Sequence, residues 1–414
     1  MKNEIINNID NPAILERLYR DNKSKFKNEF QNIYLDHKDQ QIFHYWHERL
    51  KYEEDKISFG TKKGWWFILS ASFFSGLLMN IPNITGINDE KFFTRNCALI
   101  LLCSLISYFI WKQSIPLKKW LLPAGVVLLA ALYINMLPDI VNSSSINLAF
   151  IHLPLFLWSL LGYTFLGKDV FNNHKRIQFL RYNGDLVVML SLILFSSILF
   201  TAITINLFTL IGMKIENFYL QYIAIWGIAA FPIIGTYLVE TNPQLINKVS
   251  PVIAKIFTPL VFLNLFIYLV AVIYTGKYPT QDRNLLLVFN ALLIGVMALI
   301  LFSIAEASKN SLNKFNFYLL FGLSFLTIIV NCIALSAIVY RISTWGVSPN
   351  RLAVLGGNIL IFINLLWVSF KLFMAARGKV KIEAVETSIA LFLPVYGIWT
   401  AIVTFIIPIL FHFK

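Results

Sequence analysis

Long apolar runs dominate this 414-residue sequence and constrain its fold more than any other feature. A helix needs about 20 apolar residues to cross roughly 30 Å of hydrocarbon. The predicted spans are residues 64–82, 96–111, 120–138, 147–166, 186–211, 219–239, 256–274, 285–305, 316–340, 352–374 and 388–411. Because a lipid-exposed segment must pair its own backbone groups, the pattern predicts an all-α, polytopic transmembrane helical bundle of about 11 spans.

The composition excludes several broad classes of protein. Hydrophobic residues make up 57% of the chain and charged residues 14%, whereas soluble domains carry about 25% charged residues. A soluble enzyme, a disordered chain and a nucleic-acid-binding domain are therefore excluded, although the formal net charge is +13.

The distribution of lysine and arginine predicts the orientation in the membrane. With the N-terminus inside, 27 of the 35 basic residues fall in segments on the cytoplasmic side and 8 on the other side. Cytoplasmic loops carry such an excess of basic residues. The count predicts a cytoplasmic N-terminus and an outer C-terminus, and it explains the basic charge without a nucleic-acid partner.

Residues 1–63 differ from the rest and are predicted to form a separate cytoplasmic helical region before a transmembrane domain of residues 64–414. Apolar residues recur there at helical spacing, as in Ile14, Leu15 and Leu18, then Phe26, Phe30 and Ile33, then Phe43, Trp46 and Leu50. These amphipathic helices could pack on each other, on cytoplasmic loops or on the membrane. Their mixed charges favour binding of a cytoplasmic protein partner over a basic lipid-binding surface.

Acidic and basic residues are absent from the central stretches of the predicted spans. Proton relays and ion pathways normally place such residues at membrane depth, so the sequence argues against proton coupling through buried charge. Charges at span ends form a predicted cytoplasmic cluster of Asp185, Glu240, Lys255, Glu306 and Lys371. The cluster is either a charged vestibule or ion-pair ring, or a set of ordinary interfacial charges.

Amides occupy the interior of the predicted seventh to tenth spans instead of charges. They are Asn264, Asn290, Asn331, Asn358 and Asn364. An unpaired amide in hydrocarbon costs several kcal/mol, so each needs a partner. The amides are candidate substrate-binding residues of an uncharged polar cavity, with interhelical hydrogen bonding as the alternative.

The loop between the predicted ninth and tenth spans carries two further candidate binding residues. Arg341 and Arg351 flank Trp345 in the segment 340–351. Two guanidinium groups could bind a phosphate or carboxylate at the outer surface. The alternative is a rigid turn with Trp345 in the interfacial aromatic belt.

No motif for catalysis or metal binding stands out. His44 and His47 are three residues apart, but no second pair accompanies them. The three cysteines lie inside apolar runs without a CxxC pair. The sequence therefore predicts no metal and no cofactor, and it favours a protein that is not an enzyme.

The string YRISTWGVSPNRLAVLGGNI, at residues 340–359, carries a resemblance. A Tyr-Arg followed by a Gly-x-Ser-x-Asn-Arg turn resembles the bacterial membrane family called domain of unknown function 4153. The N-terminal NPAILERLYRDNKSKFKNEF is similar to the cytoplasmic extension of its members in the Bacteroidetes group. The resemblance implies a multi-pass helical protein of the bacterial inner membrane, for which the outer C-terminus predicted from the charge count would be periplasmic. The family is uncharacterised, so the resemblance implies no activity and no functional residue.

Three functions remain open. The first is a permease-like or lipid-handling protein for a neutral or lipid-like substrate, with membrane lipids as partners. The second is a non-transporting scaffold or sensor whose residues 1–63 bind a partner. The third is a membrane-embedded transferase for a lipid-linked substrate, with Asp185 and Glu240 as candidate acids. The oligomeric state is open as well.

Overall fold

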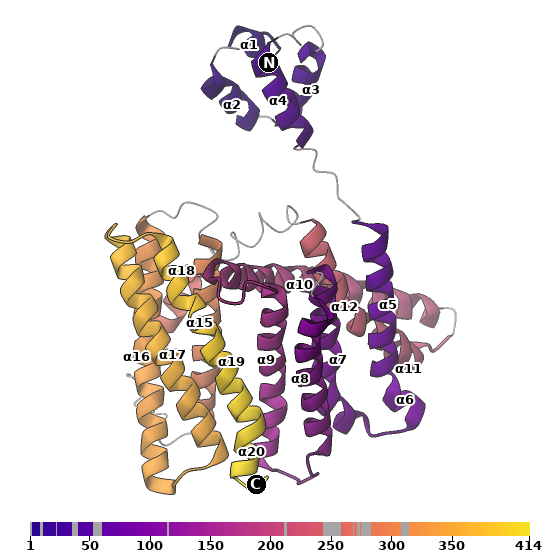
Figure 1. The fold of residues 1–414 in the computed structure, drawn as a ribbon, viewed down its shortest axis with the longest axis vertical. Coiled ribbons are helices and arrows are strands. Elements are labelled where there is room, and N and C mark those ends of the chain that lie inside the picture. Colours follow the sequence, from indigo (N-terminus) through magenta and orange to yellow (C-terminus); the bar gives the residue numbers. More distant parts are fainter. Residues whose placement is uncertain are drawn as a thin grey trace. The chain divides into compact units, whose positions relative to one another are not determined.

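A computed structural model shows the fold of the chain (Figure 1). It describes residues 2–8, 11–21, 23–34, 40–52, 60–113, 116–210, 213–242, 258–267, 269–270, 274, 283–307 and 314–414. The chain divides into two units, Met1–Ser58 and Phe59–Lys414. The division lies five residues before the predicted boundary at residue 63, and the first helix of the second unit begins at Lys62.

The first unit is a small helical domain with its own core. Its helices are α1 (Lys2–Asn7), α2 (Pro12–Asp21), α3 (Lys23–Tyr34) and α4 (Gln41–Tyr52). Proline is favoured at the first position of a helix because the N–H group that it lacks would have no hydrogen-bond partner within the helix. The buried core is formed by Ile5, Leu15, Tyr19, Phe26, Phe30, Ile33, Phe43, Trp46 and Leu50. Of the three packing alternatives for these amphipathic helices, the structure shows that they pack on each other.

The second unit is helical throughout its described residues. Its elements are α5 (Lys62–Met79), α6 (Ile81–Thr85), α7 (Asp89–Lys112), α8 (Leu117–Met136), α9 (Ser144–Leu166), α10 (Asn173–Leu210), α11 (Glu216–Phe218), the π-helix η1 (Tyr219–Ala224), α12 (Ile225–Thr241), α15 (Arg283–Ala307), α16 (Lys314–Trp345), α17 (Pro349–Ala376), α18 (Ile382–Ala390), α19 (Leu393–Ala401), the π-helix η2 (Ile402–Ile406) and α20 (Ile407–Leu410). A further apolar helix covers Thr258–Ile267.

Eight helices are long and apolar enough to cross a membrane. They are Asp89–Lys112, Lys119–Met136, Ser144–Leu166, Asn173–Asn206, Glu216–Thr241, Asn316–Trp345, Pro349–Ala376 and Ile382–Leu410. The first predicted span falls on α5, which is not among these eight. The predicted spans 256–274 and 285–305 correspond to the shorter apolar helices Thr258–Ile267 and Phe289–Ala305. The all-helical architecture of the described residues is confirmed, and the eight long apolar helices are compatible with an integral membrane protein. The count of about 11 spans stays a prediction.

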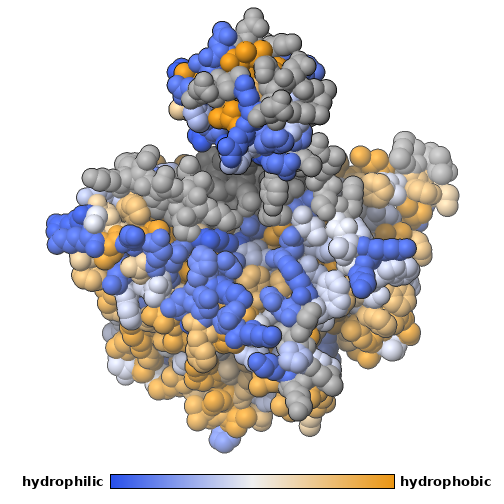
Figure 2. Space-filling view, turned by 45° about the horizontal axis from the view of Figure 1, so that its top comes forward, coloured by the Kyte–Doolittle hydropathy of each residue, from blue (hydrophilic) through white to orange (hydrophobic). Residues whose placement is uncertain are grey.

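The outside of the second unit is apolar, as lipid contact requires. Large hydrophobic side chains such as Leu129, Phe195 and Phe370 are more than half exposed. Figure 2 shows hydrophilic residues gathered on one face of this unit and hydrophobic residues below that face. Such a distribution is compatible with an integral membrane protein whose apolar side chains face lipid.

Helix α10 joins two parts of the bundle. Figure 1 shows its first part lying crosswise to α9. Ile177 and Leu180 belong to a core shared with α15, α16, α17 and α18. Phe179 and Tyr182 belong to a second core shared with α5, α7, α9 and α12. Because neighbouring residues on α10 face different cores, this helix couples the packing of the two parts.

Candidate functional site

An apolar hollow of about 490 Å³ lies between α5, α7 and α8. Its size is within the range of sites for small ligands, roughly 300–1,000 Å³. Aromatic, aliphatic and small side chains line it, namely Phe67, Ser70, Ala71, Phe74, Ser75, Leu78, Leu99, Ile100, Cys103, Ser104, Ser107, Val127 and Ala131. The hydroxyls of Ser104 and Ser107 donate to carbonyls of their own helix, so they present no free donor to the hollow.

Two paired amides mark one end of the apolar hollow. Asn96 lies four residues before Ile100 on α7, and Asn135 lies four residues after Ala131 on α8. Residues four apart share a helix face, so both amides continue the lining by one turn. Each donates to the other, from Asn135 Nδ2 to Asn96 Oδ1 at 2.8 Å and in return at 3.1 Å. The amide pair therefore joins α7 to α8 one turn beyond the residues that line the hollow.

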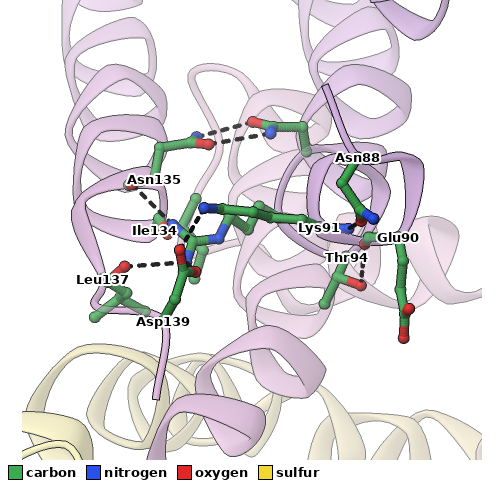
Figure 3. A network of polar contacts seen from close by, with 10 residues as sticks. Asn88, Glu90, Lys91, Thr94, Ile134, Asn135, Leu137 and Asp139 are labelled. Atoms are coloured by element: carbon green, nitrogen blue, oxygen red, sulfur yellow. Dashed lines mark hydrogen bonds and ion pairs between the residues drawn. The ribbon is translucent and has the colours of Figure 1, made fainter. Parts of the chain in front are cut away.

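A buried arginine organises the same end of α7 and α8. Arg95 donates to the main-chain oxygens of Ile134, Asn135 and Leu137 at 3.3, 2.8 and 3.0 Å. These carbonyls lie at the end of α8, where helical partners are lacking. Arg95 also pairs with Asp139 at 2.5 Å. This guanidinium therefore caps α8 and fixes the loop that follows. Figure 3 shows Leu137 and Asp139 of this loop, with Asp139 beside Lys91 of α7.

A second hollow of about 280 Å³ borders this network. Lys91, Arg95, Asp139 and Glu90 contribute charge to it, and Phe150 contributes an apolar wall. Lys91 pairs with Asp139, and this hydrogen bond together with the charge of Arg95 holds the pKa of Asp139 below its usual value. Asp139 therefore stays ionised near neutral pH. Two positive and two negative side chains make this hollow zwitterionic.

Three of the five predicted amides meet between α15, α16 and α17. Asn358 Nδ2 donates to Asn290 Oδ1 at 2.8 Å, and Asn331 Nδ2 donates to the Asn358 main-chain oxygen at 3.1 Å. Asn290 Nδ2 and Asn331 Oδ1 have no hydrogen-bond partner. These amides line neither the apolar hollow between α5, α7 and α8 nor the zwitterionic hollow beside Asp139. The arrangement is that of an interhelical joint.

The other two predicted amides lie elsewhere. Asn364 is fully buried, and its side chain lies close to the Tyr396 hydroxyl, although neither group makes a hydrogen bond of good geometry. Asn264 is exposed on the helix Thr258–Ile267. The five amides therefore do not converge on one cavity in the described structure.

The two predicted loop arginines hold a turn together. Arg351 Nη1 donates to the main-chain oxygens of Trp345 and Gly346 at 2.9 and 2.6 Å. Arg341 and Arg351 lie 5.5 and 5.8 Å from the ring of Trp345. Ser348 caps α17 by accepting from the Arg351 main-chain N–H. These contacts match the alternative of a rigid, capped turn. They also use some of the guanidinium N–H groups that binding of an anion would need.

The members of the predicted cytoplasmic cluster have separate surroundings. Glu240 pairs with Lys112, and Asp185 is buried with a partner of its own. Lys371 is half-buried. Lys255 and the side chain of Glu306 lie outside the described residues. Among the members that are described, no ion pair joins one to another.

Sequence reasoning missed the best-defined buried ion pair. Arg181 Nη2 donates to Glu386 Oε1 at 2.8 Å, and Arg181 Nε donates to the Ala305 main-chain oxygen. The pair joins α10, α15 and α18. The predicted spans leave both residues in loops. For Arg181 the reason is that α10 begins at Asn173, whereas the predicted span begins at residue 186. The apolar pair Ile177 and Leu180, three residues apart, was the signal that this helix starts early.

The described residues contain no group of three or more His, Cys, Asp or Glu side chains that could hold a metal ion. His47 stacks on Tyr34 with ring centroids 3.8 Å apart, and His44 Nδ1 lies 3.5 Å from the Tyr34 hydroxyl. Cys97, Cys103 and Cys332 are free thiols. These histidines therefore have structural contacts in the first unit.

Comparison of the chain with protein-family models, with curated proteins and with solved structures found no match. The resemblance to domain of unknown function 4153 therefore stays a proposal. What is shown is an all-helical protein with apolar helices compatible with an integral membrane protein.

Proposed function

We propose that this protein is a lipid-handling protein of the bacterial inner membrane that holds an acyl chain between α5, α7 and α8. The observation that carries the proposal is the apolar hollow of about 490 Å³, with the amide pair Asn96 and Asn135 one helical turn beyond its lining. An apolar space within a bilayer contains no water. The apolar ligands present there are lipid chains, and the paired amides Asn96 and Asn135 supply polar contacts beside the chain.

The head group would supply most of the selectivity in such a site. An acyl chain that moves from the bilayer into the hollow exchanges one apolar surrounding for another. Only packing therefore distinguishes the bound acyl chain from the acyl chain in the bilayer. Asn96 and Asn135 lie one turn beyond the chain site, and Lys91 lies further along α7. Amides and an ammonium group favour a head group with hydrogen-bond acceptors.

A groove-filling substitution tests this proposal. Ala131 lines the hollow, whereas its neighbour Leu132 is 52% exposed and does not line it. Purified full-length protein carrying Ala131→Trp or Leu132→Trp is incubated with a phospholipid whose acyl chain carries a photoactivatable group. Cross-linked peptides are then identified by mass spectrometry.

We expect Ala131→Trp to reduce cross-linking to α5, α7 and α8 severalfold and Leu132→Trp to leave it unchanged. Equal cross-linking of both variants and the parent protein would show that no chain occupies the hollow. Cross-links spread evenly over all lipid-facing helices in the parent protein would have the same meaning.

A scaffold or sensor is the second candidate function, and the first unit favours it. Its four helices bury their apolar faces in their own core, so its outer surface is available to a cytoplasmic protein. Deletion of residues 1–58 tests this function. If the deletion abolishes the cellular phenotype but retains lipid cross-linking, the scaffold function is favoured. If Ala131→Trp abolishes both lipid cross-linking and the cellular phenotype, lipid handling is favoured.

The transferase hypothesis receives no comparable support. A catalytic acid must reach the reacting group, but Glu240 is paired with Lys112 and Asp185 is buried with a partner. Neither carboxylate lines the apolar hollow between α5, α7 and α8 or the zwitterionic hollow beside Asp139.

A further inference from the structure

Three arginines of the second unit are at least nine-tenths buried, and their partners differ. Arg95, Arg176 and Arg181 have exposed fractions of 6%, 9% and 8%. Arg95 is paired with Asp139 and Arg181 with Glu386. A buried charge is costly unless an opposite charge and hydrogen bonds compensate it, and these two arginines have both.

Arg176 has only neutral partners among the described residues. Its Nε donates to the Val170 main-chain oxygen at 3.1 Å, and its Nη1 donates to the Ala390 main-chain oxygen at 3.1 Å. Nη1 also lies 3.5 Å from Asn173 Oδ1. These bonds orient the guanidinium, but they leave its positive charge without a carboxylate.

A hollow of about 150 Å³ borders Arg176, between α9, α10 and α19. Trp158 and Tyr163 of α9 and Phe179 of α10 form aromatic walls, and Leu393 and Pro394 of α19 close the remaining side. Arg176 is the charged residue among the described residues that line it.

We propose that this hollow binds a phosphate group, with Arg176 as the residue that pairs with it. Guanidinium groups bind phosphate through charge-assisted hydrogen bonds. The hollow is below the roughly 300–1,000 Å³ of sites for drug-sized ligands, so a single phosphate group is enclosed and the rest of the ligand lies outside. The phosphate belongs to a lipid head group or is free in solution.

This site is separate from the apolar hollow between α5, α7 and α8, and it does not depend on the function proposed for that hollow. The two hollows share no lining residue. The Arg176 site therefore gives the protein a second, anionic ligand class.

Thermal unfolding of the full-length protein in a non-ionic detergent and a phosphate-free buffer tests the proposal. The probes are dioctanoyl phosphatidic acid, dioctanoylglycerol, which lacks the phosphate, and inorganic phosphate. A ligand that binds the folded state raises the unfolding temperature with concentration. We expect phosphatidic acid to raise it and dioctanoylglycerol to leave it unchanged. A similar rise with inorganic phosphate identifies free phosphate as a sufficient ligand, and no rise identifies the lipid.

Two neighbouring charge variants locate the binding. Arg176→Gln removes the buried charge, whereas Lys175→Gln removes the charge of an exposed neighbour that pairs with Asp169. We expect Arg176→Gln to weaken the apparent affinity for phosphatidic acid about ten- to hundredfold, the range of a hydrogen-bonded charge. Lys175→Gln should change it less than twofold. Equal affinities of Arg176→Gln and the parent protein would overturn the proposal.

A third variant covers the case in which Arg176→Gln does not fold. Val170 lines the hollow, and its main-chain oxygen accepts a hydrogen bond from Arg176. Val170→Trp adds a bulky side chain at the hollow and retains the arginine and this main-chain oxygen. Loss of phosphatidic acid binding in this variant supports the site, and unchanged binding overturns it.

Discussion

The two units of this protein are built with opposite polarity. The buried residues described in the first unit are all hydrophobic or aromatic, whereas those of the second unit include arginines, acids, amides and many hydroxyls. Large exposed hydrophobic side chains show the reverse, with Ile14 and Tyr45 in the first unit and the remainder in the second. The first unit thus has the polarity of a domain that folds in water, whereas the second unit is compatible with a domain that folds in lipid.

The difference teaches which interaction holds each unit together. In water, burial of apolar surface drives folding, at about 25 cal/mol per Å². In lipid this term vanishes between helices, and packing and polar contacts replace it. Aromatic stacking around Phe30 and the amide joint at Asn358 are the corresponding features of the two units.

The largest expected effect is loss of the aromatic core of the first unit. Phe30 stacks on Phe26 and Phe43 with centroid distances of 5.9 and 5.1 Å. Replacement of a buried Phe by Ala costs about 3–5 kcal/mol, so Phe30→Ala should unfold residues 1–58, as measured by circular dichroism of that fragment. Tyr45→Ala, at a side chain 66% exposed, is the control. A folded Phe30→Ala fragment would contradict the packing described here.

The second effect compares the replacement of an exposed apolar residue by arginine in the two units. Leu129 on α8 is 67% exposed, and a change from Leu to Arg at a span centre disfavours insertion by about 3 kcal/mol. Leu129→Arg should therefore reduce insertion of α8 in a glycosylation-mapping assay. Ile14→Arg in the first unit should change the free energy of unfolding by less than about 0.5 kcal/mol. Full insertion of the Leu129→Arg chain would show that α8 does not face lipid.

The third effect measures the amide joint. Asn358→Leu removes the hydrogen bond to Asn290, and polar contacts between membrane helices contribute about 0.6 kcal/mol on average and up to about 1.7 kcal/mol. We expect a loss of about 1 kcal/mol in detergent unfolding. Asn264→Leu, at an exposed amide, is the matched control. Transport or lipid cross-linking lost without any change in stability would assign these amides to a binding site.

The smallest effect is the pH dependence of the first unit. Hydrogen bonds from Arg20 and Arg49 hold the pKa of Glu16 below its usual value. Its contribution is fully present above the unfolded pKa and is lost as the pH falls through the lower folded pKa. The pair is partly exposed, so the contribution is below about 1 kcal/mol. Glu16→Gln should flatten the acid side of the stability profile of residues 1–58, and an unchanged profile would contradict this account.

The fold class could be predicted from the sequence, because the length of the apolar run that a spanning helix needs depends only on the thickness of the bilayer. Eight of the eleven predicted spans fall on helices that could cross a membrane. The crosswise placement of α10 was beyond such reasoning, because its polar first part and its apolar second part form one helix. Window hydropathy detects the second part and assigns the first part to a loop.

The site was less accessible to sequence reasoning than the fold. Amides and arginines were predicted as binding residues because polar groups in spans need hydrogen-bond partners. In the structure, groups of the protein itself are the partners of Asn331, Asn358 and Arg351. The hollow between α5, α7 and α8 is lined by ordinary apolar residues with no motif. Its existence depends on helix spacing, which local sequence does not determine.

The contacts of Arg181 have a consequence for synthesis of the chain. Its two partners, Ala305 and Glu386, follow it by 124 and 205 residues. At about 5–20 residues per second, Glu386 is added roughly 10–40 s after Arg181. During that interval the start of α10 carries an arginine whose partners do not yet exist. The part of the bundle that α10 shares with α15, α16, α17 and α18 can therefore complete its packing only after α18 has been made.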